Sequence, residues 1–238
     1  AEIREAGGVA PLIVFLRSDV NKLKSQAARA LAILAEDETN SIAIGKAGIP
    51  PLVAMLGHNG TTEQKVHSAV ALGNLATNVA NRTAIHKAGG VMPLVALMRY
   101  SFSGTEQHSA CVARSIWILA ADAAGRVAIR EAGGVAPLVA LVRTAPSEHA
   151  KVALGALLDL AVDAANQTEM REAGAIKVLE ELSNGTDEQS AYASLLLTKL
   201  NSRAAPLVGM DLASAEAGLR ATLSMPWVMP SSSDGIDP

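Results

Sequence analysis

The sequence predicts an all-α fold: a right-handed α-solenoid of about five units, with three helices in each unit. Three observations support this prediction. A short phrase returns along the chain at nearly constant spacing, a leucine–alanine pair keeps the same spacing, and an apolar stripe of helical period recurs with it. A single unit of this size cannot bury its apolar face alone, so neighbouring units are expected to stack into one continuous core.

The recurring phrase joins an alanine and one or two glycines to an apolar stretch that usually contains proline. It reads AGGVAPL, AGIPPL, AGGVMPL, AGGVAPL and AGAIKVL, and its copies start at Ala6, Ala47, Ala88, Ala132 and Ala173. The intervals are 41 residues, except for one interval of 44. Two independent markers that share one period make a repeat architecture the simplest interpretation.

The second marker is the leucine–alanine pair, which begins at Leu34, Leu75, Leu119 and Leu160, with Leu200-Asn201 as a weaker fifth copy. It shares the single longer interval, which places a three-residue insertion in the segment Tyr100 to Gln107. Because the rest of the period is unchanged, the insertion is expected to lie in a loop between two helices.

Each unit is predicted to begin with a short helix, such as the one near Asn81 to Lys87, that carries one buried apolar residue. In successive units this residue is Ile44, Ile85, Ile129 and Met170. The glycines that follow are expected to supply the positive φ of a tight turn. They stand at Gly7, Gly48, Gly89, Gly133 and Gly174.

The second helix of each unit is expected to start close to a proline, where the missing N–H costs no hydrogen bond. These prolines are Pro11, Pro51, Pro93 and Pro137. The third helix ends at the marker leucine, and positions −7, −4, −3 and 0 relative to it form one apolar stripe. We therefore expect Leu34, Leu75, Leu119 and Leu160 to be almost fully buried.

The predicted units cover residues 1–35, 36–76, 77–120, 121–161 and 162–201. The chain begins in what would be the last turn of a first helix, as expected of a fragment or a processed form. After Asn201 the repeat stops, and residues 202–224 are predicted to form a capping helix for the last unit. The Pro- and Ser-rich residues 225–238 are predicted to be an extended or disordered tail, in which Trp227 is a candidate anchor.

A run of about 41 residues with three helices and glycine–proline punctuation resembles the armadillo repeat. The resemblance covers Ala1 to about Asn201. It implies a right-handed array in which the third helices line a concave face that holds a partner in extended form. The match is to a generic armadillo array and is not close to importin-α or β-catenin.

Composition and motifs argue against several other functions. The net charge of −3 and the sequence pI of about 6.0 lack the basic footprint of a nucleic-acid binder. The only cysteine, Cys111, cannot form an internal disulfide and is compatible with a cytoplasmic or other reducing compartment. No apolar run approaches the roughly 20 residues that span a bilayer. Phosphate-binding, metalloprotease and serine-hydrolase motifs are absent, so no catalytic residue, metal or cofactor is predicted.

Positions −8, −5 and −1 of each third helix are predicted to point away from the core stripe and to line the groove. The candidate partner-binding residues at these positions are Arg29, Ile33, His67, Val70, Asn74, Arg114, Ile118, Asp159 and Lys199. The arginines suit carboxylates, and an Asn amide can pair with the backbone of an extended peptide. The expected ligand is a protein or peptide segment with acidic and apolar residues.

Importin-α-like arrays place Trp at −5 and Asn at −1 in successive units, and here Asn74 alone matches that pattern. Trp117 lies at −2 and is interpreted as a packing residue between units. Basic nuclear-import signals are therefore not the expected ligand. The sequence favours an adaptor or scaffold that holds an extended peptide in its groove. The alternative is a structural subunit packed permanently into a larger assembly.

Overall fold

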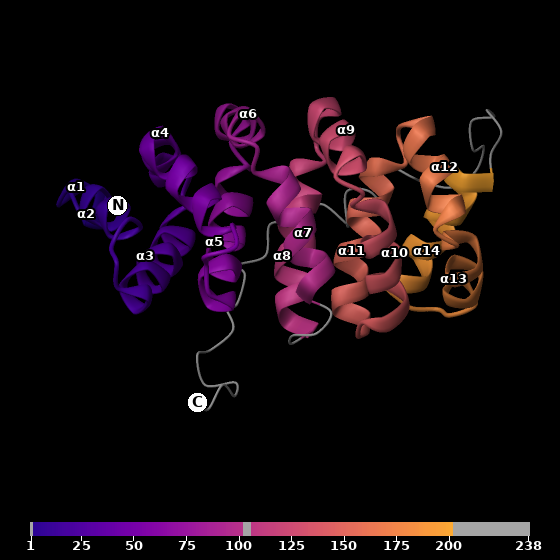
Figure 1. Ribbon diagram of the computed structural model, residues 1–238. Coiled ribbons are helices and arrows are strands. Elements are labelled where there is room, and N and C mark those ends of the chain that lie inside the picture. The colour runs from indigo at the N-terminus through magenta and orange to yellow at the C-terminus, as the bar shows by residue number, and fades with distance from the viewer. Residues whose placement is uncertain (1, 102–105, 202–238) are drawn as a thin grey trace, which may run out of the picture.

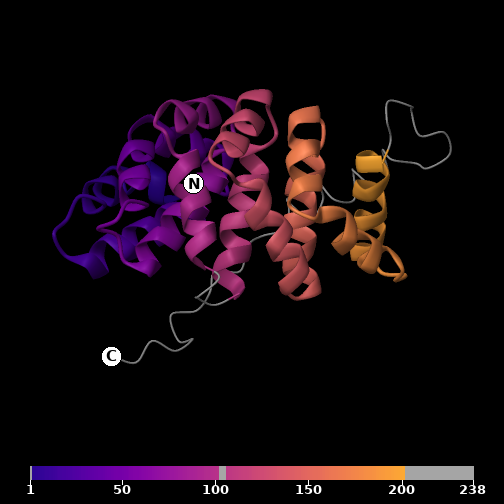
Figure 2. The ribbon, with the colours of Figure 1, turned by 45° about the vertical axis from the view of Figure 1, so that its right-hand side comes forward.

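The computed structural model describes residues 2–101 and 106–201, and these residues form fourteen helices and no strand (Figure 1). The predicted all-α class is confirmed. The helices follow one another along an elongated array in chain order, from the N-terminal end in indigo to the C-terminal units in orange (Figures 1 and 2). The capping helix and tail predicted for residues 202–238 lie outside the described residues, as does Trp227.

The third helices are the most regular elements, because each contains 14 residues. They are α3 (Asn21–Leu34), α5 (Thr62–Leu75), α8 (Glu106–Leu119), α11 (Ser147–Leu160) and α14 (Glu188–Asn201). The three-residue insertion therefore leaves the length of α8 unchanged and lies before its start.

The other helices are shorter and alternate between first and second positions in a unit. First helices are α1 (Glu2–Glu5), α6 (Val79–Lys87), α9 (Ala123–Glu131) and α12 (Ala164–Glu172). Second helices are α2 (Val9–Phe15), α7 (Val91–Ser101), α10 (Val135–Thr144) and α13 (Ala175–Ser183). Helix α4 (Glu38–Met55) fills both positions in the second unit. The division into units at 35, 76, 120 and 161 stays our interpretation; each boundary lies between two helices.

Short polar side chains start the first helices and fix where each unit begins. The Asp37 carboxylate accepts a hydrogen bond from the Asn40 N–H at 2.9 Å, and Asp122 accepts one from the Gly125 N–H at 2.8 Å. Asn78 caps α6 in the same way through the N–H groups of Ala80 and Asn81. These acceptors satisfy donors that have no partner within the helix, so they define its N-terminus.

Glycines at the turn between first and second helices adopt the left-handed conformation in four units. The φ angles are +76° at Gly7, +70° at Gly89, +68° at Gly133 and +77° at Gly174. An L-residue with a side chain is strained in this region, so glycine is the residue that the turn needs. The prediction is confirmed at these four positions.

The prediction is wrong at Gly48, which lies inside the continuous helix α4. The recurring phrase has six residues in the second unit, AGIPPL, and seven in the others, such as AGGVMPL, so the turn of the second unit is one residue shorter. The shorter segment runs through in helical conformation, although Pro50 and Pro51 each remove one backbone donor from its interior. Helix α4 still packs like two helices, against α6 as a first helix and against α5 as a second helix.

The core is one continuous cluster that runs through all units. The predicted apolar residues of the first helices, Ile44, Ile85, Ile129 and Met170, are all fully buried. Leu75, Leu119 and Leu160 are also fully buried, as predicted. Leu34 is only partly buried, which corrects the prediction for the first unit. Among the described helices no third helix precedes α3, so the side on which the later third helices contact a preceding one is uncovered in α3.

Candidate partner-binding face

The third helices form the closest-packed layer of the array. Each contacts the next along its length, from α3 through α5, α8 and α11 to α14, whereas successive second helices such as α7 and α10 barely touch. When one layer of a stack is packed more tightly than the other, the stack curves toward the tighter layer. The third helices therefore lie on the inner side of the curve, where the armadillo resemblance places the binding face.

The predicted groove residues differ in how far they reach solvent. Ile33 has 52% of its surface exposed, while Arg29, Arg114, Asp159 and Lys199 are half-buried. These five residues come from four different third helices. Cationic and apolar groups therefore share this face, which is the mixture that the sequence predicted for it. Their role in binding stays a prediction.

His67, Val70, Asn74 and Ile118 are buried, each with less than a tenth of its surface exposed. The expectation that they point freely away from the core is wrong for these four. His67 and Asn74 are drawn in by hydrogen bonds to the preceding third helix. Asn74 Nδ2 donates to the Ala32 carbonyl at 2.9 Å, and His67 Nδ1 lies 3.1 Å from both Ser25 Oγ and the Ser25 carbonyl. Val70 and Ile118 belong to the hydrophobic cluster.

The Asn74 amide keeps part of the capacity that a peptide ligand needs. Its NH₂ group is engaged with Ala32, and within the described part of the chain its carbonyl oxygen accepts no hydrogen bond. That oxygen can accept a hydrogen bond from the backbone N–H of a bound segment. Asn74 therefore fits a role as acceptor, in place of the donor-and-acceptor role that the sequence suggested.

Trp117 packs between units, as predicted, and it also makes a polar contact that the sequence did not reveal. Its side chain is 1% exposed, and its Nε1–H donates to the Asp159 carboxylate at 3.0 Å. A Cβ atom at Gly155 would lie 2.5 Å from the indole ring, so only glycine leaves room for the tryptophan. Gly155 and Asp159 occupy positions −5 and −1 of the third helix in the fourth unit, which were expected in the groove. They contribute instead to the packing between the third and fourth units.

Electrostatics on this face follow from burial. Burial lowers the pKa of His67, although Glu63 and the hydrogen bond to Ser25 oppose the effect, so the imidazole is neutral at pH 7. Burial also lowers the pKa of Arg114, against the opposing influence of Glu36 and Cys111. Arginine remains charged at neutral pH. The permanent positive charges of the face are therefore those of Arg29, Arg114 and Lys199.

A second row of polar contacts joins the first helices of successive units, from the third unit to the fifth. Arg82 Nε donates to Asp122 at 2.7 Å, and one unit further on Arg126 Nε donates to Asp163 at the same distance. Burial raises the pKa of Asp122, but the hydrogen bonds from Gly125 and Arg82 outweigh it, and the net pKa is lowered. The recurrence of Arg and Asp at equivalent positions was the signal in the sequence that could have revealed this row.

The described residues hold no group of three or more His, Cys, Asp or Glu side chains arranged to bind a metal ion. Among the same residues, no helix combines the length and the apolar character that crossing a bilayer requires. The face therefore offers amide, carboxylate, guanidinium and ammonium groups beside aliphatic side chains. These groups suit noncovalent recognition of another chain.

The fold and this face define an α-solenoid built from three-helix units. The family described as "Armadillo/beta-catenin-like repeat" matches residues 1–36. No curated protein matches the chain. The crystal structure of an engineered protein from the Northeast Structural Genomics Consortium is similar over 84% of this chain, with 32% identity and a TM-score of 0.75. The chain spans about half of that protein, namely 49% of its length.

Two designed proteins are similar over nearly their whole length. The designed armadillo repeat protein YIII(Dq)4CqI has 27% identity and a TM-score of 0.76, with 84% of this chain and 85% of that one covered. A related design, in complex with the peptide (KR)4, has 27% identity and a TM-score of 0.74, with 84% of each chain covered. Together with the 41-residue repeat, these likenesses show that the chain has the fold of an armadillo-repeat solenoid.

Proposed function

We propose that this protein is a noncatalytic protein-binding module, an adaptor or scaffold that holds an extended peptide segment along its third helices. The observation that supports this most is the continuous face of five third helices, on which charged and aliphatic side chains recur in register. A designed armadillo array of the same fold has been solved in complex with a peptide, so the architecture is able to hold one.

The ligand proposed for this face carries acidic and apolar residues. Neighbouring third helices are roughly 10 Å apart, so Arg29, Asn74 and Arg114 span about 20 Å, which an extended peptide covers in about six residues. The two arginines pair with carboxylates, and the Asn74 carbonyl oxygen accepts from a peptide N–H. The exposed Ile33 supplies an apolar contact beside Arg29.

The proposal is tested by recovering partners of the purified chain by pull-down and mass spectrometry, and then measuring their affinity for a triple variant. The variant carries Arg29→Ala, Asn74→Ala and Arg114→Ala, and circular dichroism checks that it folds. We expect the affinity to fall at least tenfold, because each charge-assisted hydrogen bond contributes about 1.5–3 kcal/mol. A folded variant that keeps full affinity rules out this face.

A second candidate function is a structural subunit of a larger assembly. The observation that favours it is the apolar surface of the first unit, where Ile3, Val14, Phe15, Val20 and Leu23 are all exposed. Surfaces of this kind often mark contacts with another protein. Light scattering after size exclusion separates the two functions: an adaptor is monomeric across a concentration series, whereas a structural subunit self-associates as concentration rises.

A further inference from the structure

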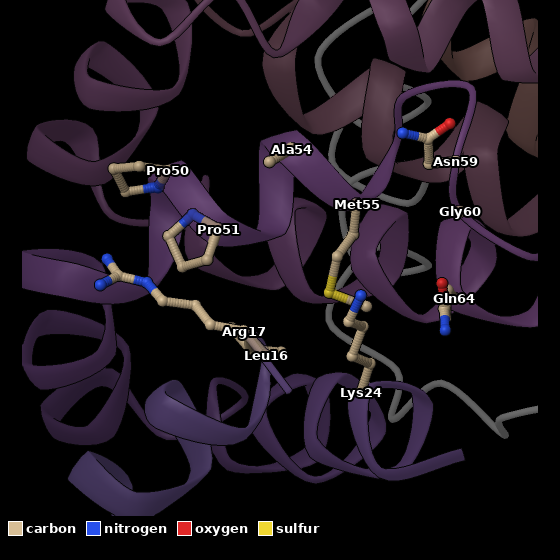
Figure 3. Close-up of a pocket in the computed structure, with 10 residues that line it drawn as sticks. All are labelled: Leu16, Arg17, Lys24, Pro50, Pro51, Ala54, Met55, Asn59, Gly60 and Gln64. Carbon is tan, nitrogen blue, oxygen red and sulfur yellow. The ribbon is translucent and has the colours of Figure 1, made fainter. Parts of the chain in front are cut away.

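A cavity of about 380 Å³ opens between the first two units, and none of the predicted groove residues lines it. Figure 3 shows its walls. Leu16 and Arg17, from the end of α2 and the turn after it, and Lys24 from α3 lie on one side. Pro50, Pro51, Ala54 and Met55 of α4 lie on the other. The floor is apolar, because Leu16, Pro51 and Met55 are buried, whereas Arg17 is exposed at the rim and Lys24 is half-buried.

The two cations of this cavity have no partner within the described part of the chain. Neither the Arg17 guanidinium nor the Lys24 ammonium makes a hydrogen bond or ion pair with a described residue. Figure 3 shows Arg17 extending below Pro51 and Lys24 rising toward Met55. Two positive charges therefore stand beside an apolar surface without a counter-charge from the described chain.

A comparison between units shows how Arg17 differs from one of its counterparts. Arg99 occupies the same position in the third unit, five residues after the leucine of the PL phrase. Its guanidinium donates to the carbonyls of Ala132 and Gly133, at 3.1 and 2.9 Å, in the glycine turn of the next unit. The unit after Arg17 lacks that turn, because α4 runs through Gly48. Arg17 therefore lacks the hydrogen bonds that Arg99 makes, and Arg143, its counterpart in the fourth unit, likewise makes none with a described residue.

The surroundings of the cavity are basic although the whole chain is acidic. Between residues 17 and 29 the chain carries Arg17, Lys22, Lys24 and Arg29 against a single acid, Asp19, whereas the net charge of the chain is −3. A local excess of positive charge attracts acidic segments and repels basic ones. The second unit has Gly57 at the position of Arg17, and the third and fourth units have Ser109 and Ala150 at the position of Lys24, so none of these units repeats the two cations.

We propose that this cleft is a second binding site, formed without the groove residues, that takes an acidic segment of a partner protein. One carboxylate of the segment pairs with Arg17 and another with Lys24, and an adjacent apolar side chain packs on Leu16, Pro51 and Met55. Such a pair of contacts matches both the charge of the rim and the apolar floor. The site does not depend on the groove residues, so either site can fail without the other.

The test uses the whole chain and a fluorescein-labelled peptide of sequence Gly-Asp-Leu-Asp-Leu-Gly, with Asn in place of Asp in a second peptide. Anisotropy gives the affinity, and the ¹³C-methyl signal of Met55 reports binding at this cleft. We expect the acidic peptide to shift the Met55 signal, and the Asn peptide to bind at least tenfold more weakly. The double variant Arg17→Ala, Lys24→Ala should bind the acidic peptide at least tenfold more weakly, because the loss of a charge-assisted hydrogen bond lowers affinity by roughly tenfold or more.

A matched control removes two exposed cations elsewhere, Arg143→Ala and Lys177→Ala, and should leave affinity within twofold. The charged groups removed in the test variant make no hydrogen bond or ion pair with a described residue, and its melting curve should match that of the wild type. The inference is overturned by a wild-type chain whose Met55 signal does not respond, or by a double variant that binds normally. Loss of binding in an Asn74→Ala, Arg114→Ala variant with no change at Met55 would instead place the peptide in the groove.

Discussion

Equivalent residues of different units are buried to different degrees, and the difference comes from their neighbours. Leu75 and Leu34 both end a third helix and both belong to the same apolar stripe. Leu75 is fully buried between α3 and α8, whereas Leu34 lies on a helix with one neighbouring third helix and is partly buried. The free energy that each side chain contributes should follow its burial.

Leu75→Ala is expected to lower the free energy of unfolding by about 2–5 kcal/mol, because it removes buried methylenes and leaves a cavity. Leu34→Ala should cost less than about 2 kcal/mol, since its surroundings are partly open and part of its transfer energy is already lost to water. Urea unfolding followed by circular dichroism measures both values. Equal costs for the two substitutions would contradict the stacking that Leu75 depends on.

His67 makes stability depend on pH. Burial lowers its folded-state pKa below the unfolded value of about 6.5, so above that value both states are neutral and its contribution is fully present. As pH falls through about 6.5, the unfolded chain binds a proton that the folded chain does not, and stability is lost. His86 and His108, whose pKa values burial also lowers, act in the same direction.

The variant His67→Gln should therefore show a smaller loss of stability between pH 7.5 and pH 5.5 than the wild type. Urea midpoints at three pH values within this range measure the slope. His58→Gln, a substitution at an exposed loop residue, controls for the loss of a histidine as such. An unchanged slope in His67→Gln would show that this imidazole is not kept neutral by the fold.

At the scale of elements, the sequence predicted which helices exist but not how they meet side by side. The period and the leucine stripe locate the third helices, and the glycines of the recurring phrase locate four of the turns. Two features of the structure could not be predicted from the sequence. Gly48 lies in a helix because its turn is one residue short. His67 and Asn74 are buried because they hydrogen-bond to the preceding third helix. Spacing along one helix identifies the stripe that faces its own unit, whereas this lateral contact leaves no periodic signal.

The packing between α8 and α11 can be tested with one substitution, Gly155→Ala. Alanine is about 0.5–1 kcal/mol better than glycine inside a helix, so Gly155→Ala would stabilise α11 if nothing opposed it. The indole of Trp117 fills that space and is buried, so we expect a net destabilisation of about 1–3 kcal/mol from overpacking. Urea unfolding measures the change.

A double variant supplies the control for Gly155→Ala. In a Trp117→Leu background the smaller side chain leaves room for the new methyl group, so Gly155→Ala should there be neutral or stabilising. The difference between the two backgrounds is the interaction energy of the pair. If the substitution costs the same in both, the strain does not come from the tryptophan.

For the whole molecule, stability is expected to vary along the array, because each unit is held by its neighbours. The first unit has exposed apolar residues in Val14 and Phe15 and a neighbour on one side among the described helices. Backbone amides of α2 should therefore exchange with deuterium at least tenfold faster than those of α5 and α8. Hydrogen exchange followed by mass spectrometry checks this. Uniform protection across these helices would mean that the array unfolds as one unit.

The joint between the third and fourth units limits how far the repeats are interchangeable. Trp117 needs a glycine opposite its ring and a carboxylate opposite its N–H, which Gly155 and Asp159 provide. At the position of Gly155 the other units carry Arg29, Val70, Arg114 and Leu195. A copy of any of these units inserted after the third would set a bulky side chain against the tryptophan. Duplication or shuffling of segments can therefore lengthen this chain at other joints, but not here without a compensating change at residue 117.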